Sequence, residues 1–230
     1  MAPPRPALAF LRRHVWSLSL SFFATVCFLQ LGSEMREGEL APFDAAVSAA
    51  IVHWRGSVDS VMYCLTYIGT GRILTILTLV LAAGLVVRAR RREAVYLVLC
   101  ASSTFALNLA MKGLFQRPRP GPAALYLLAE PSSFSFPSGH AMCSAGIFAS
   151  LAVIAQVVGW PRRWSRPVAL GCALLFVGIG VSRIYFGVHF ASDVVGGQLA
   201  SIACVSALTG WFYPRLLPGE HARTPAASEP

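Results

Sequence analysis

Long apolar stretches alternate with short polar segments along the whole chain. Stretches without a charged residue occupy positions 15–31, 73–87, 94–111, 141–160, 168–182 and 194–213. A membrane-spanning helix needs ~20 predominantly apolar residues, and the shorter stretches reach that length when their polar flanks are included. The pattern therefore predicts six membrane-spanning helices, over residues 14–32, 71–88, 93–115, 139–159, 167–184 and 191–213.

The segment between the first two predicted spans has the periodicity of an amphipathic helix. Apolar side chains recur there at helical spacing, at Phe43, Val47, Ile51 and Trp54. Residues 42–54 are therefore predicted to form a helix that either lies in the membrane interface or packs as a short helix against the rest of the protein. The next stretch, 58–68, is too short to cross a membrane alone and is expected to extend the second span.

These elements predict an all-α fold, namely a six-transmembrane helical bundle with an interfacial amphipathic helix between spans 1 and 2. Residues 1–217 are predicted to form one integral membrane domain, followed by a disordered tail over 218–230. The first apolar stretch resembles a signal peptide, but it is longer than a typical signal sequence and lacks an A-x-A-like cleavage site. We therefore expect an uncleaved first span.

The composition agrees with a membrane protein, because 56% of the side chains are hydrophobic and only 13% are charged. That leaves too little polar surface to coat a water-soluble globule of 230 residues. The formal net charge is +9, but the basic residues cluster at helix ends and not on one face, which argues against nucleic-acid binding. The six cysteines stand singly in apolar segments and are expected to be small core residues.

The distribution of basic residues predicts the orientation, since Lys and Arg are retained on the cytoplasmic side during insertion. One side of the six-span arrangement holds twelve of them: Arg5, Arg12, Arg13, Arg88, Arg90, Arg91, Arg92, Arg162, Arg163, Arg166, Arg215 and Arg223. The other side holds seven: Arg36, Arg55, Arg72, Lys112, Arg117, Arg119 and Arg183. Both termini are therefore predicted to be cytoplasmic. All basic residues except Lys112 are arginine, which favours a GC-rich bacterium and hence the bacterial inner membrane.

Three polar segments fall on the predicted outer face, although they are far apart in the sequence. Residues 111–120 read MKGLFQRPRP, residues 134–142 read FSFPSGHAM, and residues 182–193 read SRIYFGVHFASD. They lie at the end of the third predicted span, the start of the fourth, and the junction of the fifth and sixth. Three cations in one layer beside hydrocarbon are costly unless an anion balances them.

A phosphate group is the anion that suits this set of donors. Arg119 and Arg183 can offer planar forks to its oxygens, and Lys112 can supply a compact charge. Ser138 can add a hydroxyl donor. The amide of Gly139 lies at a predicted helix start, where free N–H groups and the helix dipole favour anions. These residues are therefore predicted to bind phosphate.

Chemistry beyond binding is indicated by two histidines and an aspartate. His189 and Asp193 are four residues apart and share one face if a helix begins by His189. The carboxylate can then hold one imidazole nitrogen protonated, which leaves the other free to attack phosphorus. His140 comes from a different predicted helix and can protonate the leaving oxygen. In-line displacement requires these two groups on opposite sides of the phosphorus atom.

The same three segments resemble the tripartite signature of the type 2 phosphatidic acid phosphatase superfamily. That signature is Lys-x6-Arg-Pro, then Pro-Ser-Gly-His, then Ser-Arg-x5-His-x3-Asp. It is filled here without departure, by Lys112 to Arg119 and Pro120, by Pro137 to His140, and by Ser182 and Arg183 to His189 and Asp193. The signature covers about a third of the chain, over residues 112–193.

The resemblance implies a helical bundle that hydrolyses a lipid phosphate without a metal or other cofactor. It implies that His189 is the nucleophile and forms a phosphohistidine, that Asp193 orients it, and that His140 is the general acid. It further implies phosphate binding by five residues: Lys112, Arg119, Ser138, Gly139 and Arg183. Undecaprenyl diphosphate and phosphatidate are the first expected substrates, and the oligomeric state stays open.

Taken singly, each motif also has a structural explanation. Ser138 could cap a helix, Lys112 and Arg119 could anchor the chain at the interface, and His189 and Asp193 could form a structural hydrogen bond. Arg117 lies outside the fixed positions and is expected to contact either phosphate or the membrane surface. The joint order and spacing of the motifs favour an enzyme.

Three rival functions share the same residues. A lipid phosphotransferase would hand the phosphoryl group to another lipid instead of water. A binder or transporter would hold the lipid phosphate without cleaving it, but such a protein has little need of two histidines paired with an aspartate. Vanadate-dependent haloperoxidase chemistry is disfavoured by the predicted spans.

Overall fold

The computed structural model describes residues 6–122, 125–126, 128 and 132–213, with eight α-helices in these residues. In chain order they are α1 (Pro6–Glu37), α2 (Ala41–Val52), α3 (Asp59–Ile68), α4 (Gly71–Val87), α5 (Arg91–Phe115), α6 (Gly139–Val157), α7 (Arg162–Tyr185) and α8 (Ala191–Phe212). Within the described residues there is no β-strand. The predicted all-α class is therefore confirmed.

Five helices are long and apolar enough to cross a membrane, namely α1, α5, α6, α7 and α8. The pair α3 and α4 meets the same criteria jointly but is bent by 58° at its break, and it would make a sixth span. The stretch 58–68 thus forms a helix of its own, α3, which meets α4 at this bend. The length and composition of these helices are those of an integral membrane protein.

Two predicted helix starts are wrong by several residues. Helix α1 begins at Pro6 instead of residue 14, and α7 begins at Arg162 instead of residue 167. In both cases the prediction began at the first uncharged residue, whereas a helix can extend past the hydrocarbon with charged residues in its first turns. Helix α7 also continues through Pro167, which removes only one backbone hydrogen bond near its beginning.

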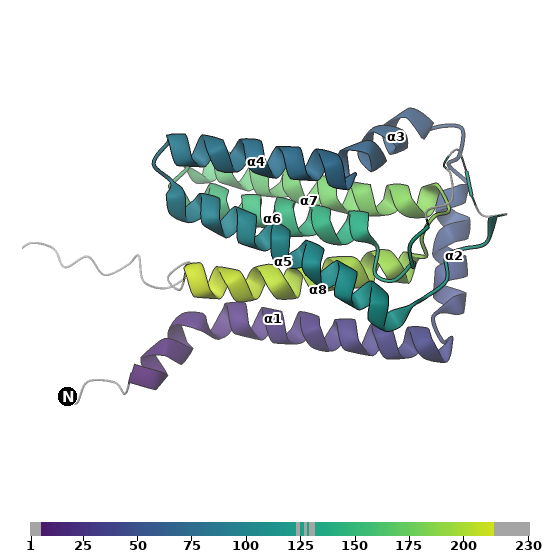
Figure 1. Ribbon diagram of the computed structural model, residues 1–230, viewed down its shortest axis with the longest axis horizontal. Helices are drawn as coiled ribbons and strands as arrows, with labels where there is room; N and C mark the ends of the chain where they lie inside the picture. Colours follow the sequence, from purple (N-terminus) through teal and green to yellow (C-terminus); the bar gives the residue numbers. More distant parts are fainter. Residues whose placement is uncertain (1–5, 123–124, 127, 129–131, 214–230) are drawn as a thin grey trace, which may run out of the picture.

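The long helices run side by side along one axis, and α2 lies across the end of the bundle at which α1 terminates (Figure 1). Helix α6 is the central element and packs against α5, α7 and α8. Its N-terminal half is rich in small residues that permit close approach. A Cβ added to Gly146, for example, would lie 2.6 Å from Oγ1 of Thr104 on α5.

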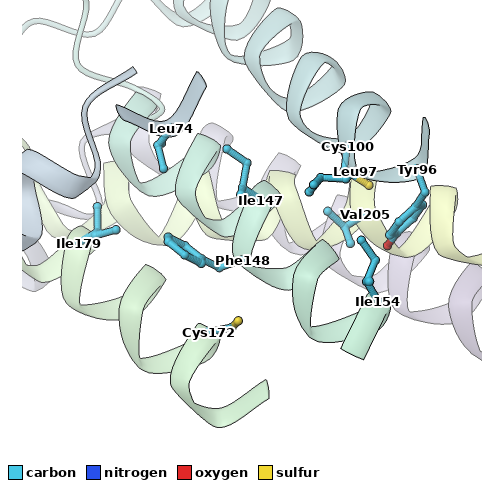
Figure 2. Packing of buried hydrophobic residues seen from close by; sticks show 10 residues of the cluster. All are labelled: Leu74, Tyr96, Leu97, Cys100, Ile147, Phe148, Ile154, Cys172, Ile179 and Val205. Atoms are coloured by element: carbon cyan, nitrogen blue, oxygen red, sulfur yellow. The ribbon is translucent and has the colours of Figure 1, made fainter. Parts of the chain in front are cut away.

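The largest buried cluster fills the space between α4, α5, α6, α7 and α8 (Figure 2). Its members are Leu74, Tyr96, Leu97, Cys100, Ile147, Phe148, Ile154, Cys172, Ile179 and Val205. Cys100 and Cys172 belong to it as small apolar side chains, as predicted, whereas Cys64 is exposed. The cluster holds the helices in register, which fixes where their ends meet.

Helix α2 has one packed face and one open face. Val47 and Ile51 pack against buried residues at the ends of α6, α7 and α8, whereas Phe43 is 43% and Trp54 57% exposed. A helix is therefore present over Ala41–Val52, two residues shorter than predicted at its end. Of the four apolar positions in the predicted stripe, only Val47 and Ile51 are packed, which suits the alternative of a short helix that packs against the rest of the protein. Its packed face also carries a buried carboxylate, Asp44.

Basic residues gather at both ends of the bundle. The connection between α4 and α5 and the start of α7 carry seven arginines, Arg88, Arg90, Arg91, Arg92, Arg162, Arg163 and Arg166. The opposite end carries the seven cations assigned to the outer face. Arg12 and Arg13 of α1 belong to the same predicted side as these seven arginines. The other three of the twelve, Arg5, Arg215 and Arg223, lie outside the described residues, as does the predicted tail over 218–230.

Candidate active site

The three signature segments meet at the end of the bundle that α2 crosses. Lys112 lies in the last turn of α5 and Arg183 in the last turn of α7. Ser138 immediately precedes α6, and Asp193 lies in the first turn of α8. His189 stands in the short connection between α7 and α8. Each helix therefore contributes its terminus to one shared layer.

The second and third segments are joined through their backbones. The amide of Ser138 donates to the carbonyl of Asp193 at 2.9 Å. A Cβ on Gly197 would lie 2.9 Å from the carbonyl oxygen of Ser138 and 3.1 Å from the amide of Met142. Glycine at position 197 is therefore what lets α8 approach the start of α6 this closely.

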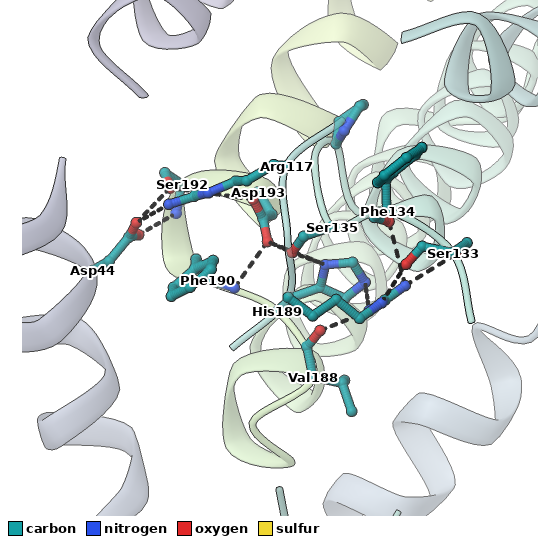
Figure 3. Close-up of polar contacts among 12 residues, drawn as sticks. Asp44, Arg117, Ser133, Phe134, Ser135, Val188, His189, Phe190, Ser192 and Asp193 are labelled. Carbon is teal, nitrogen blue, oxygen red and sulfur yellow. Dashed lines mark hydrogen bonds and ion pairs between the residues drawn. The ribbon is translucent and has the colours of Figure 1, made fainter. Parts of the chain in front are cut away.

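His189 and Asp193 form the expected pair. Nδ1 of His189 lies 3.2 Å from Oδ2 of Asp193, and the two residues are 3% and 0% exposed. The same carboxylate oxygen accepts hydrogen bonds from the hydroxyl of Ser135 and, at 2.9 Å, from the amide of Phe190 (Figure 3). The carboxylate is therefore oriented by several donors at once.

The tautomer of His189 follows from the contact on its other nitrogen. Nη1 of Arg119 lies 3.1 Å from Nε2 of His189. Because a guanidinium can only donate, Nε2 must be the acceptor and Nδ1 must carry the proton. His189 is thus in the form that a nucleophile requires, with a lone pair on Nε2 and a proton facing Asp193.

Burial lowers the pKa of His189 to about 4, because the charged imidazolium is disfavoured away from water. The hydrogen bond to Asp193 and its negative charge act in the opposite direction, and the positive charges of Arg119 and Arg183 add to the lowering. The neutral ring is therefore the dominant form at physiological pH.

Arg119 connects His189 to the loop between α5 and α6. Besides Nε2, its Nη1 donates to the carbonyl of Val188 at 2.6 Å, and its Nε donates to the carbonyl of Ser133 at 2.7 Å. Lys112 donates to the carbonyl of Phe134 in the same loop. Main-chain oxygens thus hold both cations, and Arg119 also contacts His189 directly.

His140 lies in the first turn of α6 and Arg183 in the last turn of α7. His140 is within electrostatic range of Arg183, His189, Arg119 and Lys112. Its ring contacts the break between α3 and α4, since a Cβ on Gly69 would lie 3.0 Å from Cδ2 of His140. The structure thus brings the predicted histidines and all three predicted cations into one neighbourhood.

Two buried donors in this neighbourhood have no hydrogen-bond partner among the described residues, namely Oγ of Ser138 and Nε of Arg183. Arg183 is 6% exposed and uses its Nη1 on the hydroxyl of Thr66. Ser138 makes no capping hydrogen bond with α6, so its structural explanation as a helix cap does not apply. Donors of this kind suit a ligand with several acceptor oxygens.

Gly139 begins α6, and close packing against Asn108 favours glycine there, which the sequence did not indicate. A Cβ there would lie 3.1 Å from Oδ1 of Asn108, which is tight. Asn108 is 5% exposed and donates to the carbonyl of Pro137 at 3.1 Å. Glycine therefore allows the buried amide of Asn108 to hold the turn before His140.

Arg117 has two partners that the sequence analysis did not foresee. Its Nη1 donates to Oδ1 of Asp193 at 2.6 Å, and its Nη2 donates to Oδ2 of Asp44 at 2.8 Å. The side chain is only 13% exposed. The guanidinium thus bridges two buried carboxylates, Asp193 and Asp44.

Three further residues at the site were missed in the sequence. Ser135 bonds the carboxylate of Asp193, and Ser192 donates its amide and its hydroxyl to Asp44 at 2.8 and 2.7 Å. One signal was present, because Asp44 is a lone acid in an otherwise apolar helical segment. The serines carried no comparable signal.

The matching family model is the PAP2 superfamily, and it covers residues 93–216. A curated relative, phosphatidylglycerophosphatase B of Bacillus subtilis (strain 168), is 30% identical over 172 residues, which cover 74% of this chain and 83% of that protein. A putative undecaprenyl-diphosphatase, YbjG, of Escherichia coli (strain K12) is 32% identical over 127 residues, or 54% of this chain and 59% of that protein.

Among solved structures, the chain resembles a transmembrane PAP2 type phosphatidylglycerolphosphate phosphatase from Bacillus subtilis. The TM-score is 0.75 at 28% sequence identity, and the alignment covers 83% of this chain and 94% of that one. Fold and sequence therefore point to the same group of proteins.

Proposed function

Because the chain belongs to the PAP2 superfamily, we propose that it is a membrane lipid phosphatase that works through a phosphohistidine on His189. The observation that carries this proposal is the state of His189. Nδ1 is held by a buried carboxylate, while Nε2 is unprotonated and lies among cations. A nucleophile beside a phosphate-binding set of donors is what phosphoryl transfer to a protein side chain requires.

In the first step, the lone pair of Nε2 attacks phosphorus and the bond to the leaving oxygen breaks. His140 gives its proton to that oxygen, so that the lipid leaves as a neutral alcohol or a shorter phosphate. Arg119 turns its Nη1 from Nε2 to a phosphate oxygen, and Lys112, Arg183, Ser138 and the amide of Gly139 bind the other oxygens. Asp193 stabilises the positive ring by accepting from Nδ1.

In the second step, water attacks the phosphohistidine. His140, now neutral, takes one proton from the water, while a P–O bond forms and the N–P bond breaks. Inorganic phosphate leaves, and both histidines return to their starting states. The same residue thus serves first as acid and then as base.

The substrate is a lipid with a phosphate monoester or a terminal pyrophosphate, and its chain stays in the bilayer. The B. subtilis relative is named for phosphatidylglycerophosphate and the E. coli relative for undecaprenyl diphosphate, so both join phosphatidate as candidates. With six spans, including the bent α3–α4 pair, and cytoplasmic termini, the site faces the periplasm or exterior. Helix α2 then lies at that interface.

Phosphate release from a panel of lipids tests the proposal. Detergent-purified protein is given phosphatidate, phosphatidylglycerophosphate or undecaprenyl diphosphate in mixed micelles with EDTA present. We expect release from at least one lipid, and a loss of more than about 10³-fold in His189→Gln, because the attacking nitrogen is gone.

Rapid quenching in alkali followed by mass spectrometry should locate the phosphoryl group on residue 189. No release from any lipid, or equal release by His189→Gln, would contradict the proposal. Phosphoryl transfer that occurs only after an acceptor lipid is added would identify a phosphotransferase instead.

A further inference from the structure

A closed polar network lies behind the catalytic pair, on the side away from Nε2. Asp44 of α2 accepts from Nη2 of Arg117 at 2.8 Å and from the amide and hydroxyl of Ser192 at 2.8 and 2.7 Å. Arg117 donates from Nη1 to Oδ1 of Asp193 at 2.6 Å and to the hydroxyl of Ser192 at 2.7 Å. Its Cζ lies 4.1 Å from the ring centre of Phe190.

The two carboxylates in this network are far apart in the sequence and almost fully buried. Asp44 is 3% and Asp193 0% exposed. A buried carboxylate is tolerated only when it is paired and hydrogen-bonded. Figure 3 shows that one guanidinium fork does this for both at once, with Asp44 at one end and Asp193 at the other.

The charge balance of the network affects His189 directly. Arg117 alone would neutralise Asp193 and weaken its hold on the proton of Nδ1. Asp44 compensates the charge of Arg117, so the three groups together keep one net negative charge facing the imidazole. The fork geometry also prevents rotation of the Asp193 carboxylate, because Oδ1 is bound by Arg117 while Oδ2 receives Nδ1.

We propose that Asp44 and Arg117 are positioning residues for the His189–Asp193 pair, through which α2 sets the orientation and net charge of the catalytic carboxylate. This inference rests on the proposed function and deepens it. The observed side-chain partners of both residues are protein groups, with Asp193 bound directly by Arg117 and Asp44 bound to Arg117 and Ser192. They act through Asp193, and α2 is therefore a working part of the active site.

Other charged or titratable groups also act on this pair and stay unchanged in the test. They come from three helices and the loop before α6: His140 of α6, Arg183 of α7, Lys112 of α5 and Arg119 of the loop. All of them lie at the same end of the bundle as the network.

The test compares Asp44→Asn with Arg117→Gln in the full-length protein. Asp44→Asn keeps the shape but removes the compensating charge, so the pKa of His189 should fall. Arg117→Gln removes the cation that competes for Asp193, so the pKa of His189 should rise. Both should lose about 10–100-fold in kcat with little change in KM, since the carboxylate is misplaced and substrate contacts are intact.

Histidine-selective NMR in detergent follows the titration of His189, with His189→Gln assigning the signal. Glu39→Gln is the matched control, because it changes an exposed carboxylate just before α2. That control should alter neither kcat nor the titration.

Unchanged titration and kcat in both folded variants would overturn the proposal, as would shifts in the same direction. If a single variant does not fold, the double variant Asp44→Asn/Arg117→Gln removes both partners and should still lose about tenfold or more in kcat. The titration needs no substrate. A protein that releases no phosphate but shows the opposite shifts would therefore refute the proposed function and keep this inference.

Discussion

The two sides of the His189 ring are built in opposite ways. On the Nδ1 side, the carboxylate of Asp193 is bound by Ser135, the amide of Phe190 and Arg117, and Arg117 is in turn bound by Asp44. On the Nε2 side lies Arg119, which donates to main-chain carbonyls, as the nearby Lys112 does. Of the predicted phosphate-binding residues, Ser138 and Arg183 each keep a buried donor without a partner among the described residues.

This difference separates orientation from binding. A fully satisfied polar network holds its members in one arrangement. A buried donor without a partner costs about 1–3 kcal/mol, which a protein tolerates where the donor has a use. The hydrogen bonds on the Nδ1 side are therefore already formed in the protein without substrate. On the Nε2 side, we expect the bound phosphate to accept the hydrogen bonds that the protein leaves open. Changes on the two sides should accordingly have different signatures.

The largest effect on the Nε2 side is expected from His140→Ala. The rate should fall by about 10²–10⁴-fold, because a general acid is lost. The loss should be much smaller for an aryl phosphate whose leaving group needs no proton. Phosphate release is measured on both substrates, with His53→Ala as a control at an exposed histidine. An equal loss on both substrates would contradict the assignment.

A smaller effect is expected from Arg183→Gln. Loss of a charge-assisted hydrogen bond to phosphate should lower kcat/KM by about 10–100-fold. The melting temperature in detergent should stay unchanged or rise, because a buried cation beside other cations has been removed. Arg163→Gln, at the exposed start of the same helix, is the control. A fall in stability with full activity would show that Arg183 belongs to the structural side.

The smallest effect concerns pH. Burial lowers the pKa of His189 to about 4, so Nε2 is unprotonated above that pH and the reaction loses its nucleophile only as the pH falls through it. Arg119→Gln removes a cation that lowers this pKa. The acid limb of the variant's pH–rate profile should therefore lie at higher pH than that of the unmodified protein. NMR titration of His189 separates this from the titration of the substrate phosphate. A limb that moves to lower pH would contradict the assigned contact.

The sequence predicted the all-α class and the set of residues that meet at one end of the bundle. Apolar runs are a direct consequence of the hydrocarbon they must cross, and Lys112, Arg119, His140, Arg183 and His189 each have a side chain suited to phosphate. Their convergence follows from helix ends meeting at one face. The helix starts of α1 and α7 were less predictable, because charged first turns outside hydrocarbon resemble loops.

The Nδ1 side was largely invisible in the sequence. Asp44 precedes Arg117 by 73 residues and Asp193 by a further 76. No periodicity links an aspartate on one helix to an arginine in a distant loop. Ser135 lies in a loop and Ser192 in the first turn of α8, and serines are too common at both kinds of position to stand out. Such partnerships depend on tertiary packing, which α2 provides by crossing the end of the bundle.

The glycine pair at 196 and 197 limits how this chemistry can be transplanted. A Cβ on Gly196 would lie 2.6 Å from the ring of Phe136, and one on Gly197 would meet the main chain of Ser138 and Met142. A design that transferred only the three short motifs to another scaffold would include the functional groups but not the close contact between α8 and the start of α6 that sets their spacing. The smallest portable unit therefore includes a full turn of α8 beyond Asp193.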